Sequence, residues 1–206
     1  MEQYQGNLEW IFTPPCGDAG YSAIDFLQPQ NVYVACAGIS VQKSTDGGNT
    51  FSGAENGIDA NDSSDFIPPL VMDPSDSSRL YFGTYRLYQT LDGANSWTAI
   101  SPDLTSGTEI AAIAVAPSDS NTVYTGAAYS GIVYVTRNAL AGTGATWSEV
   151  NLPFPLSLTQ ITVDPQNPLT AWAAVTGPTC CTASVGLVYK TTNGGATWAN
   201  FSNAPL

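Results

Sequence analysis

The sequence predicts an all-β protein, a β-propeller of four-stranded antiparallel blades, with four blades and one extra N-terminal strand in the chain. A turn that ends in an aromatic residue recurs four times. Its aromatic residues, Phe51, Trp97, Trp147 and Trp198, follow one another at intervals of 46, 50 and 51 residues. That spacing is typical of one blade, which takes about 40–50 residues. No window shows the sustained 3.6-residue apolar period of a helix, so we expect little or no helix.

Each turn element places a hydroxyl residue two positions before an aspartate or asparagine, and then glycine, a second hydroxyl residue and the aromatic residue. The positions that define it are Ser44, Asp46, Gly48, Thr50 and Phe51, then Thr90, Asp92 and Trp97, then Asn138 and Trp147, and finally Thr191, Asn193, Gly195, Thr197 and Trp198. The second copy has Ala94 at a glycine position, and the third copy holds four extra residues. In this kind of turn the Asp or Asn side chain accepts backbone amide hydrogens, and glycine takes a positive φ.

A second signature precedes each turn element. It is an apolar run that ends in an Asp-Pro or Pro-Ser-Asp turn and is followed by an aromatic strand, as in residues 70–82, 113–124 and 161–172, with a less regular copy at 24–34. Proline fixes φ and aspartate bonds to its own backbone, so these turns predict hairpins. The predicted boundaries are residues 15–60, 61–104, 105–154 and 155–206 for the four blades. Residues 1–14 are predicted to form the outer strand of a preceding blade.

Composition excludes several classes of function. The 206 residues include 17 Asp and Glu, 5 Lys and Arg and no His, for a net charge of -12. Without His there is no His-bound zinc and no Ser-His-Asp or Cys-His catalysis. An acidic chain without a basic cluster argues against nucleic acid and anionic membranes as partners. No apolar stretch approaches the roughly 20 residues of a membrane helix, and no cofactor is expected.

The four cysteines have no CxxC spacing, which excludes a zinc ribbon and a thioredoxin-type motif. Cys16 and Cys36 are candidates for a disulfide in an exported protein, with free buried thiols as the alternative. Adjacent cysteines rarely form a disulfide with each other without backbone strain. Cys180 and Cys181 are such a pair, and they lie in an insertion between the second and third strands of the last blade.

The turn elements resemble the Asp-box, or BNR repeat, whose pattern is Ser-x-Asp-x-Gly-x-Thr-Trp. Together with the Asp-Pro signature, the chain resembles part of a sortilin-like or xyloglucanase-like bacterial propeller. The resemblance implies that the box residues are structural anchors, and that this chain is a piece of a propeller with more blades. It also implies a secreted or cell-envelope location, which the Lys-poor, Asn/Thr/Ser-rich sequence favours, although no signal peptide is present in this chain.

Propeller ligands usually bind near the start of each innermost strand. The repeat register places Asp18, Asp65, Glu109 and the pair Thr159-Gln160 at these positions. A glycosidase needs two carboxyl groups about 5–10 Å apart, one with a raised pKa, so the three acids are candidate catalytic residues. The preferred alternative is that they only keep an acidic protein soluble.

Two further sites are considered. Sialidase chemistry needs three converging arginines, but Arg79, Arg86 and Arg137 occupy different places in the repeat and are predicted not to meet. The oxygen-rich segment 56–65, with Asp59, Asp62 and Asp65, could hold calcium. It lacks the EF-hand pattern, and a solvated acidic turn is the preferred interpretation, so no metal is predicted.

The expected function is a non-catalytic binding or scaffolding segment that recognises a glycan or a protein surface. The alternative, which the resemblance permits, is part of a xyloglucanase-like glycoside hydrolase; an assembly factor built on the same fold is supported by no particular residue. Four blades in an arc would expose the apolar faces of the two end blades. The rest of a parent propeller or a second copy of the chain is therefore expected to cover them.

Overall fold

In the computed structural model the chain forms four four-stranded antiparallel sheets and one short hairpin. The structure describes residues 2–4, 10–12, 15–152, 157–176 and 188–202. The hairpin pairs β1 (Glu2–Tyr4) with β2 (Trp10–Phe12). The N-terminal segment therefore differs from the single outer strand that we expected at residues 1–14, because its strand at 10–12 has a partner of its own.

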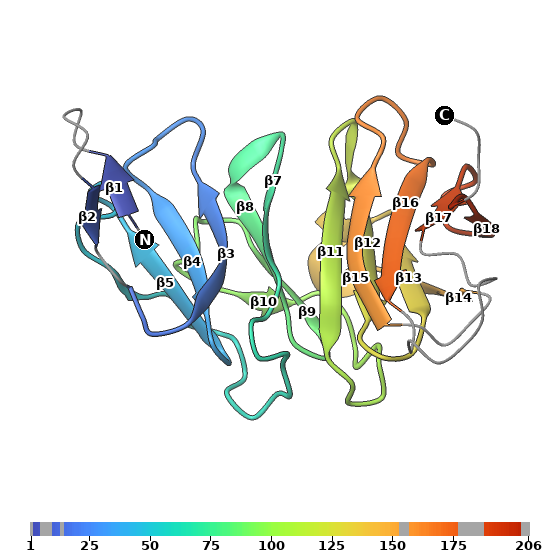
Figure 1. Cartoon of the computed structure of the whole chain (residues 1–206), viewed down its shortest axis with the longest axis horizontal. Coiled ribbons are helices and arrows are strands. Elements are labelled where there is room, and N and C mark those ends of the chain that lie inside the picture. Colours follow the sequence, from blue (N-terminus) through green and yellow to red (C-terminus); the bar gives the residue numbers. More distant parts are fainter. Residues whose placement is uncertain (1, 5–9, 13–14, 153–156, 177–187, 203–206) are drawn as a thin grey trace.

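The four sheets, blades 1 to 4, stand side by side in chain order (Figure 1). Within each blade the strands follow one another as a meander. Blade 1 is β3 (Ala19–Ile24), β4 (Val32–Cys36), β5 (Ser40–Ser44) and β6 (Ser52–Gly53). Blade 2 is β7 (Leu70–Asp73), β8 (Asp76–Gly83), β9 (Leu87–Thr90) and β10 (Thr98–Ala99).

Blades 3 and 4 repeat this order. Blade 3 is β11 (Ile110–Ala116), β12 (Asp119–Ala127), β13 (Ile132–Thr136) and β14 (Ser148–Asn151). Blade 4 is β15 (Ser157–Val163), β16 (Ala171–Thr176), β17 (Val188–Thr191) and β18 (Ala199–Asn200). The extra residues of the third turn element form the 3-10 helix η1 (Ala139–Gly144), the only helix in the described part of the chain.

The core lies between neighbouring blades. Three apolar clusters join blade 1 to blade 2, blade 2 to blade 3 and blade 3 to blade 4. The second strand of each of the first three blades contributes one tyrosine, Tyr33, Tyr81 or Tyr124, whose side chain is at most 1% exposed. Fully burying a large apolar side chain contributes about 1.5–3 kcal/mol. Because each face is buried only by the next blade, the sheets depend on stacking for their stability.

The outer face of blade 1 is also covered. Val32, Val34 and Cys36 are at most 4% exposed there, and the partly buried Cys16 and Phe51 pack against them. A disulfide joins Cys16 to Cys36 across a sequence separation of 20 residues. The chain that precedes β3 is therefore fastened to this face, which is not left open as the sequence suggested.

Candidate functional site

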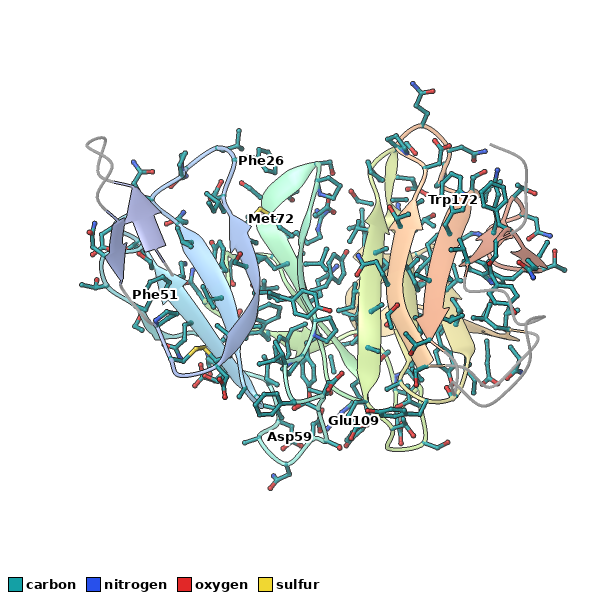
Figure 2. All side chains as sticks on the ribbon, viewed as in Figure 1. Phe26, Phe51, Asp59, Met72, Glu109 and Trp172 are labelled. Carbon is teal, nitrogen blue, oxygen red and sulfur yellow. A yellow bond between two sulfur atoms is a disulfide. The ribbon has the colours of Figure 1, made fainter. Side chains whose placement is uncertain are left out.

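The loops that precede the first strands gather at one end of the blades, which we call the lower end after its place in Figure 1. The same end holds the connections between second and third strands, since Ala37 donates its backbone amide to Asp18 and Ala128 donates to Glu109. Figure 2 labels Asp59 and Glu109 at this end. Loops held by a rigid scaffold are where binding residues are usually found.

The loop of residues 54–69, between blades 1 and 2, binds three blades together at the lower end. Gly38 of blade 1 donates its backbone amide to Phe66 at 2.9 Å. Ser63 donates its hydroxyl to Glu109 Oε1, beside blade 3, at 2.9 Å. Within blade 2, Thr84 donates its hydroxyl to Asp62 Oδ2 at 2.8 Å. The loop thus connects blades 1, 2 and 3 at this end.

A buried carboxylate, Asp62, is the centre of this network. Its side chain is 1% exposed, and Arg86 binds it through two nitrogens while also reaching Asp59 at 3.3 Å. Tyr88 and Thr84 donate their hydroxyls to the same carboxylate at 2.8 Å. Burial raises the pKa of Asp62, but the hydrogen bonds from Arg86, Thr84 and Tyr88 outweigh it and hold that pKa below its usual value.

The candidate catalytic acids lie at the lower end, each next to a different blade. Asp18 is exposed before β3, Asp65 accepts the backbone amide of Phe66 at 2.6 Å, and Glu109 accepts from Ser63. No hydrogen bond joins any two of these three described carboxylates. Burial, and to a lesser extent the negative charge of Asp65, raises the pKa of Tyr21.

The pair Thr159 and Gln160 does not lie where the repeat register placed it. Both residues are inside β15, at the irregularity in its pairing with β16 between Leu158 and Gln160. Matching the Pro117 turn to the Pro165 turn aligns Glu109 with Ser157, so the predicted pair lay two residues too far into the strand; β11 has the same irregularity, between Ile110 and Ala112. Blade 4 therefore contributes neither residue to the predicted ring of polar side chains.

The carboxylates of the possible calcium site, Asp59, Asp62 and Asp65, are engaged in other contacts. Arg86 already pairs with Asp59 and Asp62, and Asp65 accepts the backbone amide of Phe66. Among the described residues no group of three or more His, Cys, Asp or Glu side chains is arranged to hold a metal ion. Arg86, the partner of Asp62, lies 24 positions further along the chain, and no sequence motif links the two residues. The sequence therefore did not predict this ion pair.

Exposed aromatic side chains at the lower end were also missed. Phe66 is 66% exposed and Tyr129 is 75% exposed. Tyr129 moreover has φ 62°, a left-handed backbone conformation that is costly for a bulky residue. Strain of this kind tends to accumulate at functional sites. These rings differ from the many aromatic residues of the core only in their exposure. Because exposure depends on how the blades pack, the sequence gives no signal for it.

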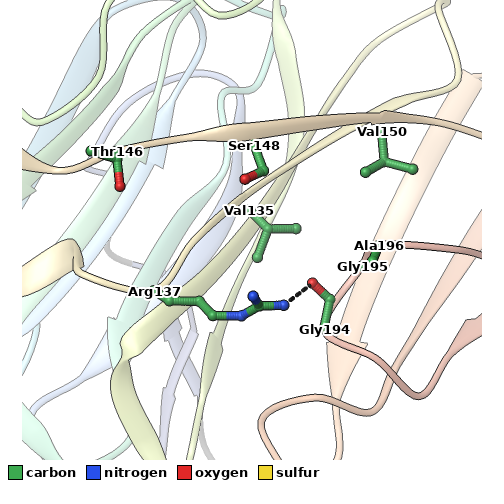
Figure 3. Close-up of a pocket in the computed structure, with 8 residues that line it drawn as sticks. All are labelled: Val135, Arg137, Thr146, Ser148, Val150, Gly194, Gly195 and Ala196. Atoms are coloured by element: carbon green, nitrogen blue, oxygen red, sulfur yellow. Dashed lines mark hydrogen bonds between the residues drawn. The ribbon is translucent and has the colours of Figure 1, made fainter.

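The three arginines do not meet, in agreement with their predicted separation. Arg79 pairs with Asp73 and Asp76, whereas Arg86 pairs with Asp59 and Asp62. Arg137 lines a cavity of about 230 Å³ between blades 3 and 4 and donates to the Gly194 carbonyl at 2.7 Å (Figure 3). This cavity is smaller than the usual 300–1,000 Å³ of ligand pockets, and we assign it no ligand.

The two aspartate copies of the turn element make the same hydrogen bonds. Asp46 Oδ1 accepts the backbone amides of Asn49 and Thr50, and its Oδ2 accepts the Thr50 hydroxyl. Asp92 makes the same set with Asn95 and Ser96.

The asparagine copies keep part of this set. Asn193 accepts the Thr197 amide at 3.0 Å, and Asn138 accepts the Thr146 amide at 2.8 Å across η1. Ala94 takes the glycine-like φ of 63°. Every one of these polar groups is thus occupied within its own turn. Cys180 and Cys181 lie outside the described residues.

Two of the aromatic residues also reach back to the preceding blade. Trp97 donates its indole Nε1 to the Ala54 carbonyl at 2.7 Å, and Trp147 donates to the Ile100 carbonyl at 3.1 Å. Trp198 is buried against blade 3, but its Nε1 has no partner among the described residues. Phe51, which has no such donor, packs on its own blade. The three tryptophans therefore hold neighbouring blades together, whereas Phe51 does not.

No protein-family model matches the sequence, and no curated protein matches it. Several solved structures do match the structure of this chain. An ancestral GH74 enzyme is 22% identical with a TM-score of 0.66, over 90% of this chain and 24% of that one. The GH74 xyloglucanase from Xanthomonas campestris is 18% identical with a TM-score of 0.67, over 88% of this chain and 29% of that one. YCF48 from Cyanidioschyzon merolae is 15% identical with a TM-score of 0.60, over 93% of this chain and 62% of that one.

The chain has a β-propeller fold. Its four blades correspond to between about a quarter and three fifths of the length of these structures. At such low identities the similarity shows the architecture of the propeller alone, because one fold carries many functions. Within the part of the chain that the structure describes, no helix is both long enough and apolar enough to span a bilayer.

Proposed function

We propose that this propeller is a non-catalytic binding segment that recognises a glycan chain at its lower end. The observation that carries the proposal is Tyr129, an aromatic side chain that is 75% exposed on a left-handed backbone. Such a conformation costs about 1–2 kcal/mol. A solvent-facing ring does not repay that cost by packing, so we infer that it serves binding.

Other residues of the lower end suit a sugar ligand. Phe66 presents a second exposed ring at the same end, and exposed apolar groups rimmed by polar ones mark binding surfaces. The carboxylates of Asp18, Asp65 and Glu109 can accept hydrogen bonds from sugar hydroxyls. Arg86 is occupied by Asp62, so this end offers acceptors and rings, and not a basic site for an anionic ligand.

We also propose that the protein acts outside the cytoplasm, in secretion or at the cell envelope. The disulfide between Cys16 and Cys36 supports this location, since disulfides persist in oxidising compartments. The turn elements, whose Asp and Asn side chains are occupied by their own turns, serve as structural anchors of an Asp-box type. They take no part in ligand chemistry in this proposal.

Calorimetric titration of the chain with a panel of β-glucan and xyloglucan oligosaccharides tests glycan binding. Phe66→Ala and Tyr129→Gly should each weaken binding about tenfold, equivalent to about 1.4 kcal/mol. Phe26→Ala is the matched control, because Phe26 is 50% exposed but lies at the opposite end of the blades (Figure 2). No binding to any oligosaccharide, or an equal loss in the control, would count against the proposal.

Tyr129→Gly has a second, opposite effect. Glycine adopts a positive φ without strain, so this variant should be more stable by about 1 kcal/mol while binding glycan less well. Ser106→Gly is the comparison, since Ser106 is also exposed and has φ 54° but carries no ring. It should gain similar stability and keep full binding. A loss of stability in Tyr129→Gly would remove the argument from strain.

Glycoside hydrolysis is the second candidate, favoured by the fold shared with GH74 enzymes and by two carboxylates on neighbouring blades, Asp65 and Glu109. Retaining and inverting hydrolases both need such a pair. Product release from β-glucan oligosaccharides, abolished by Asp65→Asn and by Glu109→Gln, would establish this function and overturn the non-catalytic proposal.

A further inference from the structure

The forward face of each blade, the side turned toward the following blade, carries an aromatic residue opposite a fixed position of the third strand. The cross-strand pairs are Tyr33 with Lys43, Tyr81 with Gln89, Tyr124 with Val135, and Trp172 with Lys190. The three tyrosines are buried by the next blade, whereas Trp172 is only partly buried. Figure 2 labels Trp172 on β16, in the blade at one end of the array.

The junction of blades 1 and 2 shows how a following blade uses this face. Lys43 lies over the Tyr33 ring, 5.7 Å from its centre, and donates from Nζ to the Gly93 carbonyl of the next turn element at 2.7 Å. It also donates to Asn95 Oδ1 at 3.3 Å. A Cβ on Gly93 would lie 2.8 Å from the Tyr33 hydroxyl. Only glycine allows the turn to approach the aromatic residue this closely.

The junction of blades 3 and 4 repeats this contact with another cation. Arg137 donates to the carbonyl of Gly194 at 2.7 Å and to that of Asn193 at 3.3 Å. A Cβ on Gly195 would lie 3.4 Å from the Tyr124 ring. At two of the three junctions, then, a cation of one blade binds the glycine carbonyl of the next turn. The middle junction, where η1 enlarges the turn, lacks this contact.

Blade 4 has the same arrangement without a following turn. Lys190, at the position of Lys43, lies 5.0 Å from the centre of the Trp172 ring and 5.3 Å from that of Phe201. Its ammonium has no hydrogen-bond acceptor among the described residues. Phe201 is 40% exposed. The face thus presents a cation above two rings, and nothing in the described structure uses its donors.

We propose that the forward face of blade 4 is a docking surface for a further blade of the same repeat. The glycine of that blade's turn element lies on Trp172, and its carbonyl accepts a hydrogen bond from Lys190. A polar end blade that simply faces water is the alternative, because terminal repeats often have polar outer faces. Lys43 decides against it, since the same residue at the same position serves a buried junction.

A tandem chain tests the proposal, with a second copy of residues 61–104 joined after Leu206. This added blade carries the Gly93 turn that already binds Lys43. Hydroxyl-radical footprinting read by mass spectrometry reports the exposure of each tryptophan. We expect modification of Trp172 to fall about tenfold in the tandem chain, and that of Trp147 to stay unchanged. Lys190→Met should restore at least half of the modification, and Lys190→Arg should not.

A second tandem chain guards against failure of the first to fold. It adds residues 155–206 with Trp172→Phe in the added copy, so that the original Trp172 can be followed alone. Unchanged modification of Trp172 in both tandem chains overturns the proposal. So does protection of Trp172 in the 206-residue chain that increases with concentration and with dimer formation, because the occupant would then be a second copy.

Discussion

Removing the guanidinium of Arg86 should destabilise the propeller, because it leaves a buried carboxylate without its cation. Arg86→Met keeps much of the apolar stem but leaves the Asp62 carboxylate, 1% exposed, without its cation. Tyr88 and Thr84 continue to donate to that carboxylate. Two hydroxyl donors do not replace a charge partner that binds through two nitrogens.

The expected cost follows from burial. Breaking a buried ion pair by removing one partner costs about 3–5 kcal/mol. Because the Arg86 side chain is itself 27% exposed, we expect the lower limit, about 3 kcal/mol. For a chain of this size 1 kcal/mol corresponds to about 2–4 °C in Tm, so Tm should fall by about 6–12 °C. Since Asp62 would then have a raised pKa, the cost should be smaller at pH 4 than at pH 7.

Urea unfolding followed by circular dichroism measures this cost. Arg137→Met is the control, because Arg137 is exposed and binds neutral carbonyls; it should cost less than about 1 kcal/mol. Adding Asp62→Asn to Arg86→Met should recover about half of the loss, since it removes the unpaired charge. A cost below about 1 kcal/mol, or a double variant no more stable than Arg86→Met, would refute the reasoning.

Three other predictions concern stability. Trp97→Phe should cost about 1–2 kcal/mol more than Trp198→Phe in urea unfolding, because Trp97 donates its Nε1 to a carbonyl and Trp198 has no acceptor among the described residues; equal costs would contradict this. Replacing both Cys16 and Cys36 with Ala should lower stability by about 3 kcal/mol, the entropy of the loop that the disulfide closes, and an unchanged Tm would exclude the bond. Hydrogen bonds from the side chain and backbone of Thr50 and from Ser44 lower the pKa of Asp46 from 3.8 to about 2. The stability linked to this group is therefore complete above about pH 4 and lost as the pH falls through about 2. Asp46→Asn should flatten that part of the curve of stability against pH, and parallel curves would argue against it.

The blades could be predicted because their signals are local. The Asp-Pro turns set the first hairpin of a blade, and each turn element joins a third strand to an outer strand within a few residues. Asp46 and Asp92 accept hydrogen bonds only from residues two to four positions away. The residues that make such short-range contacts are close neighbours in the sequence, so a sequence pattern can predict them.

The site could be predicted only in part. The register of the repeat placed Asp18, Asp65 and Glu109 at the correct end of the blades, since the start of a strand follows from the turn before it. It misplaced Thr159 and Gln160 because the fourth copy was aligned two residues too far along the chain: the Pro117 and Pro165 turns match Glu109 to Ser157, at the start of β15. Nothing in the spacing indicated that Tyr129 would point into solvent.

The sequence by itself thus determined the number of blades, the order of their strands and the residues that close each turn, because these depend on neighbours along the chain. Only the tertiary structure decided that Arg86 would pair with Asp62, that Trp97 would reach the Ala54 carbonyl of another blade, and that Lys190 would have no acceptor among the described residues. Those outcomes depend on how one blade faces another, and that packing brings together residues far apart in the sequence.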